Sequence, residues 1–105
     1  MKMIKQQILA IVCAIGAMLP MTSAHADNDK HARNLSASCA ACHGTSGHSV
    51  GGTPVLAGMD KQLFVAQMQA FKSGARPATV MHQHAKGYTD EEFELLAGFF
   101  AAQKR

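Results

Sequence analysis

Cys39-Ala40-Ala41-Cys42-His43 places two cysteines two residues apart, with a histidine directly after the second. This spacing is the attachment signature of c-type haem. Side chains three positions apart on one helical turn point the same way, so each thiol can add to one vinyl group of the same haem. The imidazole of His43 then lies under the iron. We therefore expect one covalently bound haem c, with Cys39 and Cys42 as thioether links and His43 as an iron ligand.

Two other uses of this motif fit the chain less well. A structural zinc site needs four protein ligands, typically with a second Cys/His pair. His48, His82 and His84 are available as ligands, but no cysteine follows Cys42. A thioredoxin-like redox pair is expected near a strand–helix–strand pattern, and the sequence shows none. Haem attachment is favoured over both.

The first 26 residues have the features of an export signal. A basic start precedes the apolar run 8–19, and Ala24-His25-Ala26 has the small-x-small pattern of a cleavage site. The apolar run is too short to span a bilayer, which takes about twenty residues. We expect residues 1–26 to be removed and residues 27–105 to form one monohaem domain in the periplasm, without a membrane span. A retained amphipathic anchor is the alternative.

The size and charge of the remaining chain limit its function. A domain of fewer than about 80 residues buries little apolar surface and often needs a staple, which a bound haem provides. Cys39 and Cys42 are the only cysteines beyond the predicted signal, so two thioether links use both. The full chain has 10 Lys and Arg against 7 Asp and Glu, and removal of Lys2 and Lys5 with the signal leaves 8 against 7. The remaining chain is not strongly basic, so a nucleic-acid partner is not expected.

The hydrophobic pattern predicts an all-α domain with three main helices and a long loop around the haem. The first helix covers residues 27–41 and leads into the haem motif. Its expected inner face contains Ala32, Leu35 and Ser36. The second helix covers residues 60–73 and ends before Gly74. Its expected inner face contains Leu63, Phe64, Gln67, Met68 and Phe71.

The third main helix begins with a capping box. Thr89 is followed three residues later by Glu92, the pattern in which each side chain bonds the other residue's backbone. The helix is expected to run to about residue 103, and Gly98 in it to allow close approach of another helix. Its predicted inner stripe is Phe93, Leu96, Ala97 and Phe100.

Two connections complete the predicted domain. Residues 44–58 are rich in glycine and form a loop long enough to imply a function. We expect this loop to wrap one side of the haem, with apolar side chains packed on the ring: Val50, Val55 and Leu56. Residues 75–81 are expected to be extended, because Pro77 disfavours helix at Arg76. A short polar turn then leads to Gly87.

The second iron ligand decides whether the haem transfers electrons or binds small molecules. We expect it to be Met81, because an extended segment can lay its side chain across the far face of the haem. Met68 has the pattern of core filler and Met59 follows His43 closely. Those two methionines, His82, His84 and an open site are the alternatives. The other ring nitrogen of His43 is expected to donate to a backbone carbonyl, for which we propose Pro54.

The motifs together resemble a known family. Ser38-Cys-Ala-Ala-Cys-His-Gly44, Thr53-Pro54 and Met81 before a capped last helix resemble class I cytochromes c. Four further blocks are similar to the cytochrome subunits of flavocytochrome c sulfide dehydrogenases, and the similarity extends over nearly all of residues 36–101. These blocks are Gly47-His-Ser-Val-Gly-Gly52, Phe71-Lys-Ser-Gly74, Thr79-Val-Met81 and Ala85-Lys-Gly-Tyr-Thr-Asp90.

The resemblance implies a role in periplasmic electron transfer without a catalytic site in this chain. The implied partner is an FAD-containing subunit that oxidises sulfide and passes electrons singly to the haem, which then reduces a downstream acceptor. Cys39 and Cys42 match the haem links, His43 the proximal ligand and Met81 the distal ligand. Some members have two haem domains, and this chain resembles the monohaem form. The alternatives are a freely diffusing shuttle to an oxidase or reductase, and a haem sensor with an open iron.

Overall fold

The computed structural model describes residues 23–105, and helix α6 (Asp90–Ala101) lies at the centre of their packing. Thr89 Oγ1 accepts a hydrogen bond from Glu92 N at 3.1 Å, and Glu92 Oε2 accepts one from Thr89 N at 2.9 Å. The predicted capping box is therefore present. The predicted inner stripe is confirmed in full, because all four of its members are buried: Phe93, Leu96, Ala97 and Phe100.

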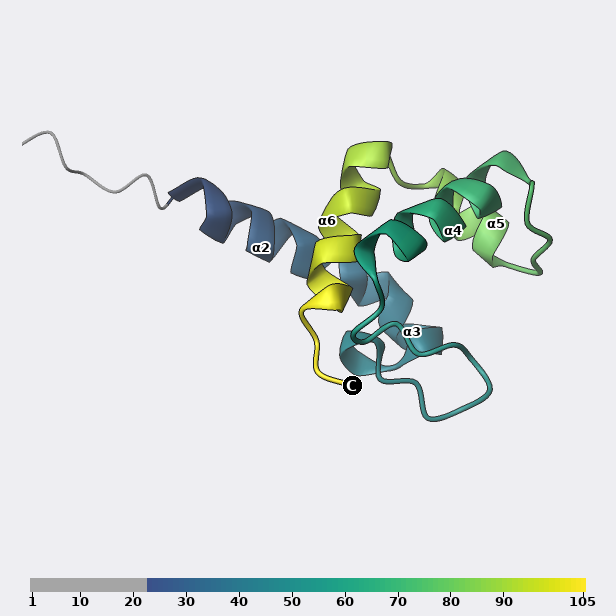
Figure 1. Ribbon diagram of the computed structural model, residues 1–105, viewed down its shortest axis with the longest axis horizontal. Helices are drawn as coiled ribbons and strands as arrows, with labels where there is room; N and C mark the ends of the chain where they lie inside the picture. Colours follow the sequence, from purple (N-terminus) through teal and green to yellow (C-terminus); the bar gives the residue numbers. More distant parts are fainter. Residues whose placement is uncertain (1–22) are drawn as a thin grey trace, which may run out of the picture.

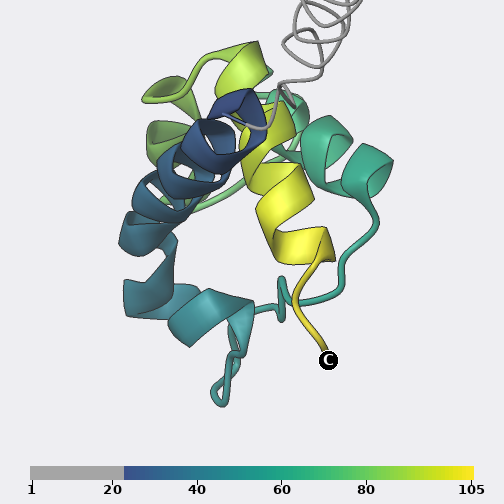
Figure 2. The same cartoon turned by 90° about the vertical axis from the view of Figure 1, so that its left-hand side faces the viewer.

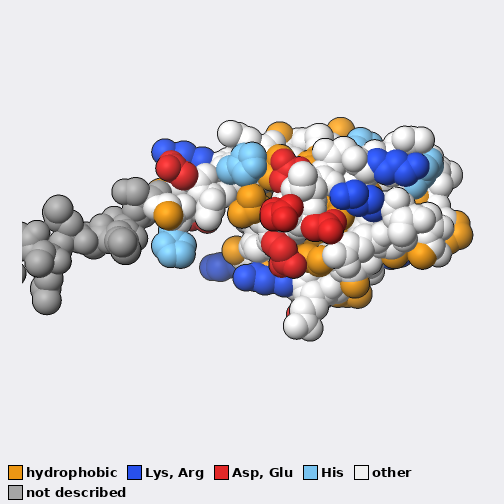
Figure 3. Space-filling view, turned by 90° about the horizontal axis from the view of Figure 1, so that it is seen from above, with side chains coloured by type: hydrophobic (Ala, Val, Ile, Leu, Met, Phe, Trp, Pro, Cys, Tyr) orange, Lys and Arg blue, Asp and Glu red, His pale blue; other side chains and the backbone are white. Residues whose placement is uncertain are grey.

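Figures 1 and 2 show α6 lying between its neighbours, and it packs against both α2 and α4. Acidic side chains gather at the N-terminal end of α6 (Figure 3), where they complement the positive end of the helix dipole. The expected close approach at Gly98 is wrong. A Cβ atom at Gly98 would have no neighbour within 4 Å, so α2 and α4 contact α6 along other faces.

Helix α4 (Lys61–Ser73) has the predicted position and caps. The Asp60 side chain accepts from Leu63 N at 3.0 Å, and Gly74 ends the helix in the left-handed conformation with φ 81°. Phe64 and Met68 are buried against α6. Leu63 was expected on the same face, but its side chain is exposed, because only a narrow stripe of α4 meets the core.

The predicted first helix is interrupted before the haem motif. Helix α2 (Ser23–Ser36) is followed by a 3-10 turn, η1 (Ala37–Cys39), and then by the short helix α3 (Ala40–His43). Ser36 is buried, and its hydroxyl donates to the Arg33 carbonyl at 2.7 Å, a side-chain bond that competes with regular helical bonding. Residues 1–22, which contain most of the predicted signal 1–26, lie outside the described residues.

The segment before α6 also differs from its prediction. Its first part lacks helix as expected, but Met81 begins an unpredicted helix, α5 (Met81–Lys86), where the sequence predicted the end of an extended connection and a turn. Packing against α4 stabilises this short helix, and Ala85 is fully buried there. His82 and His84 therefore lie on a helix. Between Ser23 and Arg105 the all-α prediction is confirmed, but the predicted first helix is divided into α2 and α3, and α5 is an additional helix.

The loop predicted for residues 44–58 is present and extends to residue 60, interrupted by the 3-10 turn η2 (Thr45–Gly47). Backbone bonds fold the loop back on itself, since Leu56 N and Ala57 N both donate to Gly47 O. Gly58 N donates to Phe100 O at 2.8 Å and ties the loop to α6. Between Ser23 and Arg105, no helix is both long and apolar enough to cross a bilayer.

Candidate haem site

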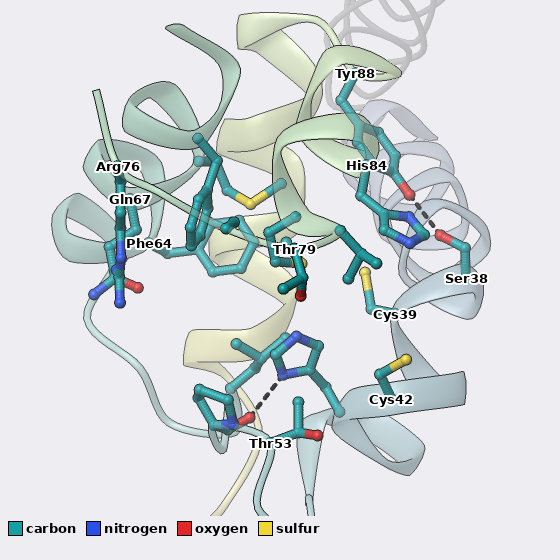
Figure 4. Close-up of a pocket in the computed structure, with 18 of the residues that line it drawn as sticks. Ser38, Cys39, Cys42, Thr53, Phe64, Gln67, Arg76, Thr79, His84 and Tyr88 are labelled. Atoms are coloured by element: carbon teal, nitrogen blue, oxygen red, sulfur yellow. Dashed lines mark hydrogen bonds between the residues drawn. The ribbon is translucent and has the colours of Figure 1, made fainter. Parts of the chain in front are cut away.

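A cavity of about 450 Å³ lies between the haem motif, the loop 44–60, α4 and the segment that leads into α5 (Figure 4). Its wall is mostly apolar. The apolar lining comes from Leu56, Phe64, Met68, Phe71, Pro77, Ala78, Val80 and Met81. The three residues that the motif contributes to the wall, and Ser38 directly before it, are polar or reactive: Ser38, Cys39, Cys42 and His43.

Both cysteines of the motif face this cavity. Cys39 ends η1 and Cys42 lies in α3, so the 3-10 turn and the short helix replace the single helical turn that the sequence predicted. Figure 4 shows the two thiols on the same side of the cavity. They do not form a disulfide. Burial raises the pKa of the Cys39 thiol above its ordinary value, against the effect of hydrogen bonds from Ser38 and Tyr88.

His43 is buried at the base of the cavity, and its Nδ1 atom lies 2.7 Å from the Pro54 carbonyl oxygen (dashed in Figure 4). A carbonyl only accepts hydrogen bonds, so Nδ1 carries the ring hydrogen and donates it. The neutral ring then keeps its lone pair on Nε2, the nitrogen that can bind a metal. The loop thus selects the tautomer of His43 that a metal needs.

The five candidates for the second ligand lie in different places. Met68, Met81 and His84 line the cavity, whereas Met59 and His82 do not. Met68 is buried in the core between α4 and α6, and Met81 is half-buried at the start of α5. Figure 4 shows the His84 ring toward Ser38 and Cys39, on the side of the cysteines.

Residues 29–102 match the sequence model of the family "Cytochrome c", about seven-tenths of the chain. The chain belongs to the cytochrome c family. It therefore carries one covalently bound haem c and belongs to a family of electron carriers. The chemistry of the cavity fits this group, because an apolar wall suits the porphyrin, two thiols suit its vinyl groups and a directed imidazole suits its iron.

Three similar proteins extend the comparison. A 66-residue stretch is 47% identical to the cytochrome subunit of sulfide dehydrogenase from Chlorobaculum tepidum, covering 63% of this chain and 60% of that protein. A 67-residue stretch is 39% identical to the thiosulfate dehydrogenase electron acceptor of Stutzerimonas stutzeri, covering 60% of this chain and 31% of the relative. Cytochrome c-553 of Helicobacter pylori is 34% identical over 68 residues, which are 63% of this chain and 71% of that protein.

The cytochrome's loop contributes less to the cavity than the sequence predicted. Thr53, Pro54 and Leu56 line it, but Val50 and Val55 do not. The side chain of Val50 is fully exposed, with a relative accessibility of 103%. The expectation that both valines pack on the ring is wrong, because only the returning end of the loop turns inward.

Sequence analysis missed several residues of the cavity wall, of which Tyr88 has the most bonds. Its hydroxyl donates to the Leu35 carbonyl at 3.2 Å and lies 2.6 Å from Ser38 Oγ. Its own carbonyl accepts from Lys72 Nζ at 2.7 Å. Tyr88 thus connects α2, the haem motif and α4. The signal in the sequence is its position between Gly87 and the capping residue Thr89. An aromatic side chain in the turn before α6 is placed to pack against the core.

Proposed function

We propose that this cytochrome is the electron-accepting haem subunit of a periplasmic sulfide dehydrogenase whose other subunit contains FAD. The observation that carries the proposal is the 47% identity to the cytochrome subunit of sulfide dehydrogenase from Chlorobaculum tepidum. The chain spans about three-fifths of the length of that relative, so substrate and partner belong to the proposal. The predicted export signal at residues 1–26 supports the periplasmic location.

The residues of the motif have separate roles in this proposal. Cys39 and Cys42 form the thioether links that fix the haem in the cavity. His43 binds the iron through Nε2, and Pro54 holds its ring by accepting the Nδ1 hydrogen at 2.7 Å. This outer bond fixes the orientation of the imidazole and increases its basicity toward the metal.

We assign the second iron position to Met81. Met59 and His82 do not line the cavity. Met68 is almost fully buried in the α4–α6 core, where a thioether serves as packing, and the His84 ring lies on the cysteine side. Met81 is the remaining candidate. Its half-buried side chain lines the cavity directly after the segment 75–80.

The bound haem supplies an iron that cycles between Fe(III) and Fe(II) by one electron. With His43 and Met81 both bound to it, the iron would have no position left for a substrate, and the site would transfer electrons without bond chemistry. The apolar side chains of the wall exclude water, and Met81 favours the reduced state relative to a second imidazole. A haem held by these residues would accept electrons one at a time, so the two electrons released from sulfide at a flavin would leave that flavin singly.

Substitution of the methionines tests the ligand assignment. In Met81→Ala, we expect the ferric protein to lose the weak long-wavelength absorption band of Met-ligated haem, to bind CO when reduced and to have a lower reduction potential. Met59→Ala is the matched control, which should keep the band and should not bind CO. A Met81→Ala protein with the spectrum and potential of the wild type would show that another residue is the ligand.

The partner is tested by purifying the tagged protein from its native host and adding sulfide. We expect a flavoprotein to copurify and the haem of this complex to be reduced by sulfide, at a rate well above that of the haem protein alone. The second candidate function is a diffusing shuttle, which the similarity to a thiosulfate dehydrogenase electron acceptor favours. Purification without a flavoprotein, with haem reduction independent of sulfide oxidation by a partner, would support the shuttle and contradict the subunit.

A further inference from the structure

We propose that Arg76 and Gln67 bind the propionate groups of the haem and raise its reduction potential. Both residues lie on the side of the cavity opposite the two cysteines of the haem motif. The inference rests on the proposed attachment of the haem through Cys39 and Cys42. Neither residue belongs to the attachment motif or to the proposed iron ligands.

Arg76 is an unusual component of this wall. It is the only Lys, Arg, Asp or Glu among the described residues that line the cavity, although much of its side chain is exposed. Within residues 23–105 it forms no ion pair, whereas Lys72 pairs with Asp90 at 3.5 Å. A guanidinium is always charged, so Arg76 offers the cavity a permanent positive group that suits an anionic part of the ligand.

The covalent links determine which part of the haem faces Arg76. The two vinyl groups lie on one side of the porphyrin and the two propionates on the other. Figure 4 shows Cys39 and Cys42 on one side of the cavity and Arg76 and Gln67 on the opposite side. With the vinyl groups bonded to the thiols, the propionates therefore point toward Arg76 and Gln67.

Arg76 is held in place by its own surroundings. Its guanidinium stacks over the Phe71 ring at 4.8 Å, and its backbone N–H donates to the Ala70 carbonyl at 3.1 Å. Pro77 restricts the backbone directly after it. A guanidinium ordered in this way presents a planar fork of donors that matches a carboxylate, at a lower entropic cost than a free side chain.

Gln67 complements this fork from α4. It is half-buried on the face that also carries Phe64 and Phe71, and its amide can donate two hydrogens to carboxylate oxygens. The other basic residues near Arg76 do not line the haem cavity. Lys72, His82 and Lys86 line an adjoining groove, and Arg76 is the basic residue that lines both this groove and the cavity. Arg76 and Gln67 are thus the donors that this part of the wall offers to the propionates.

The charge of Arg76 affects the iron through space. A positive group beside the propionates offsets their negative charge and so destabilises Fe(III) relative to Fe(II). Loss of this group lowers the reduction potential. The effect requires direct contact with the propionates, because Arg76 is largely exposed and solvent and salt screen its charge over longer distances.

Five variants of the holoprotein test the inference: two matched pairs and Arg76→Lys. Arg76→Met is compared with Arg33→Met, which removes the same charge from the exposed side of α2. Gln67→Glu adds a carboxylate at the cavity with almost no change of shape, and Gln69→Glu adds the same charge on the exposed side of α4. Reduction potentials and the resonance Raman bands of propionate bending are measured for each.

We expect Arg76→Met and Gln67→Glu to lower the potential by more than their controls and to shift the propionate bands, with the absorption of the axially ligated haem unchanged. Arg76→Lys should restore most of the potential but not the band position, because it keeps the charge and loses the fork. Potentials and bands equal to those of the two controls would overturn the inference. A wild-type protein without covalent haem would instead overturn the proposed function.

Discussion

The α4–α6 side of the cavity and the loop side, residues 44–60, are stabilised by different contacts. On the first side, large apolar residues of two capped helices bury one another, and Phe93, Leu96 and Phe100 have almost no exposed surface. On the loop side, the buried residues are small or few, chiefly Gly47, Leu56 and Ala57, and backbone hydrogen bonds connect them. The helical side carries its own core, whereas the loop side depends on bonds to Gly47, the His43–Pro54 bond and the haem.

The largest effect is expected from removing the covalent links. In a Cys39→Ala/Cys42→Ala protein, most of the haem should be lost, because the loop side has little apolar surface of its own to retain it. Haem content after export measures this directly, and hydrogen exchange should show residues 44–60 losing protection before α6. Equal protection of both sides without haem would contradict the difference between them.

The second-largest effect is expected from truncation of a buried side chain in the helical core. Phe93→Ala should lower the free energy of unfolding by about 3–5 kcal/mol, since Phe93 is fully buried. Val50→Ala is the control on the loop side and should change it by no more than about 0.5 kcal/mol, because Val50 is fully exposed. Denaturant unfolding of the holoproteins checks both. A similar loss in both variants would mean that the loop valine packs on the haem after all.

A glycine substitution tests the backbone on the loop side. Gly47 has φ 79°, and a Cβ there would lie 2.8 Å from Ala57 N. Gly47→Ala should therefore cost at least about 1–2 kcal/mol in the free energy of unfolding. Gly51→Ala, in the same loop but without neighbours within 4 Å, should be close to neutral. If both variants unfold at the same denaturant concentration, the turn at Gly47 does not stabilise the loop.

The smallest expected effect is an increase in the free energy of unfolding. Gly98 lies inside α6, and an added Cβ meets nothing within 4 Å. Gly98→Ala should raise the free energy of unfolding by up to about 1 kcal/mol, the difference in helix propensity between the two residues. Thermal unfolding of the holoprotein is sufficient to detect it. A lower midpoint would show that another helix does approach α6 closely at Gly98, as the sequence predicted.

The same comparison explains what the sequence could predict. The capping box at Thr89, the Asp60 cap and the stripe from Phe93 to Phe100 are local patterns, and the structure contains all of them. The motif at residues 39–43 predicted the haem for the same reason, since its meaning depends on spacing alone.

The remaining features depend on contacts distant in sequence. Helix α5 is short and is stabilised by packing on α4, so the pattern of residues 81–86 does not reveal it. The loop valines have apolar side chains, but the path of the loop leaves Val50 in solvent. Arg76 is exposed, and the turn around Pro77 also brings it to the cavity wall and onto the Phe71 ring. Its position could not be predicted from local pattern.

Mass spectrometry of the exported protein tests the central claim most directly. The account predicts that the intact chain, and the proteolytic peptide that contains Cys39 and Cys42, are each heavier by the mass of one haem, which remains bound under denaturing conditions. A peptide at its unmodified mass, or one carrying only a disulfide between Cys39 and Cys42, would contradict it.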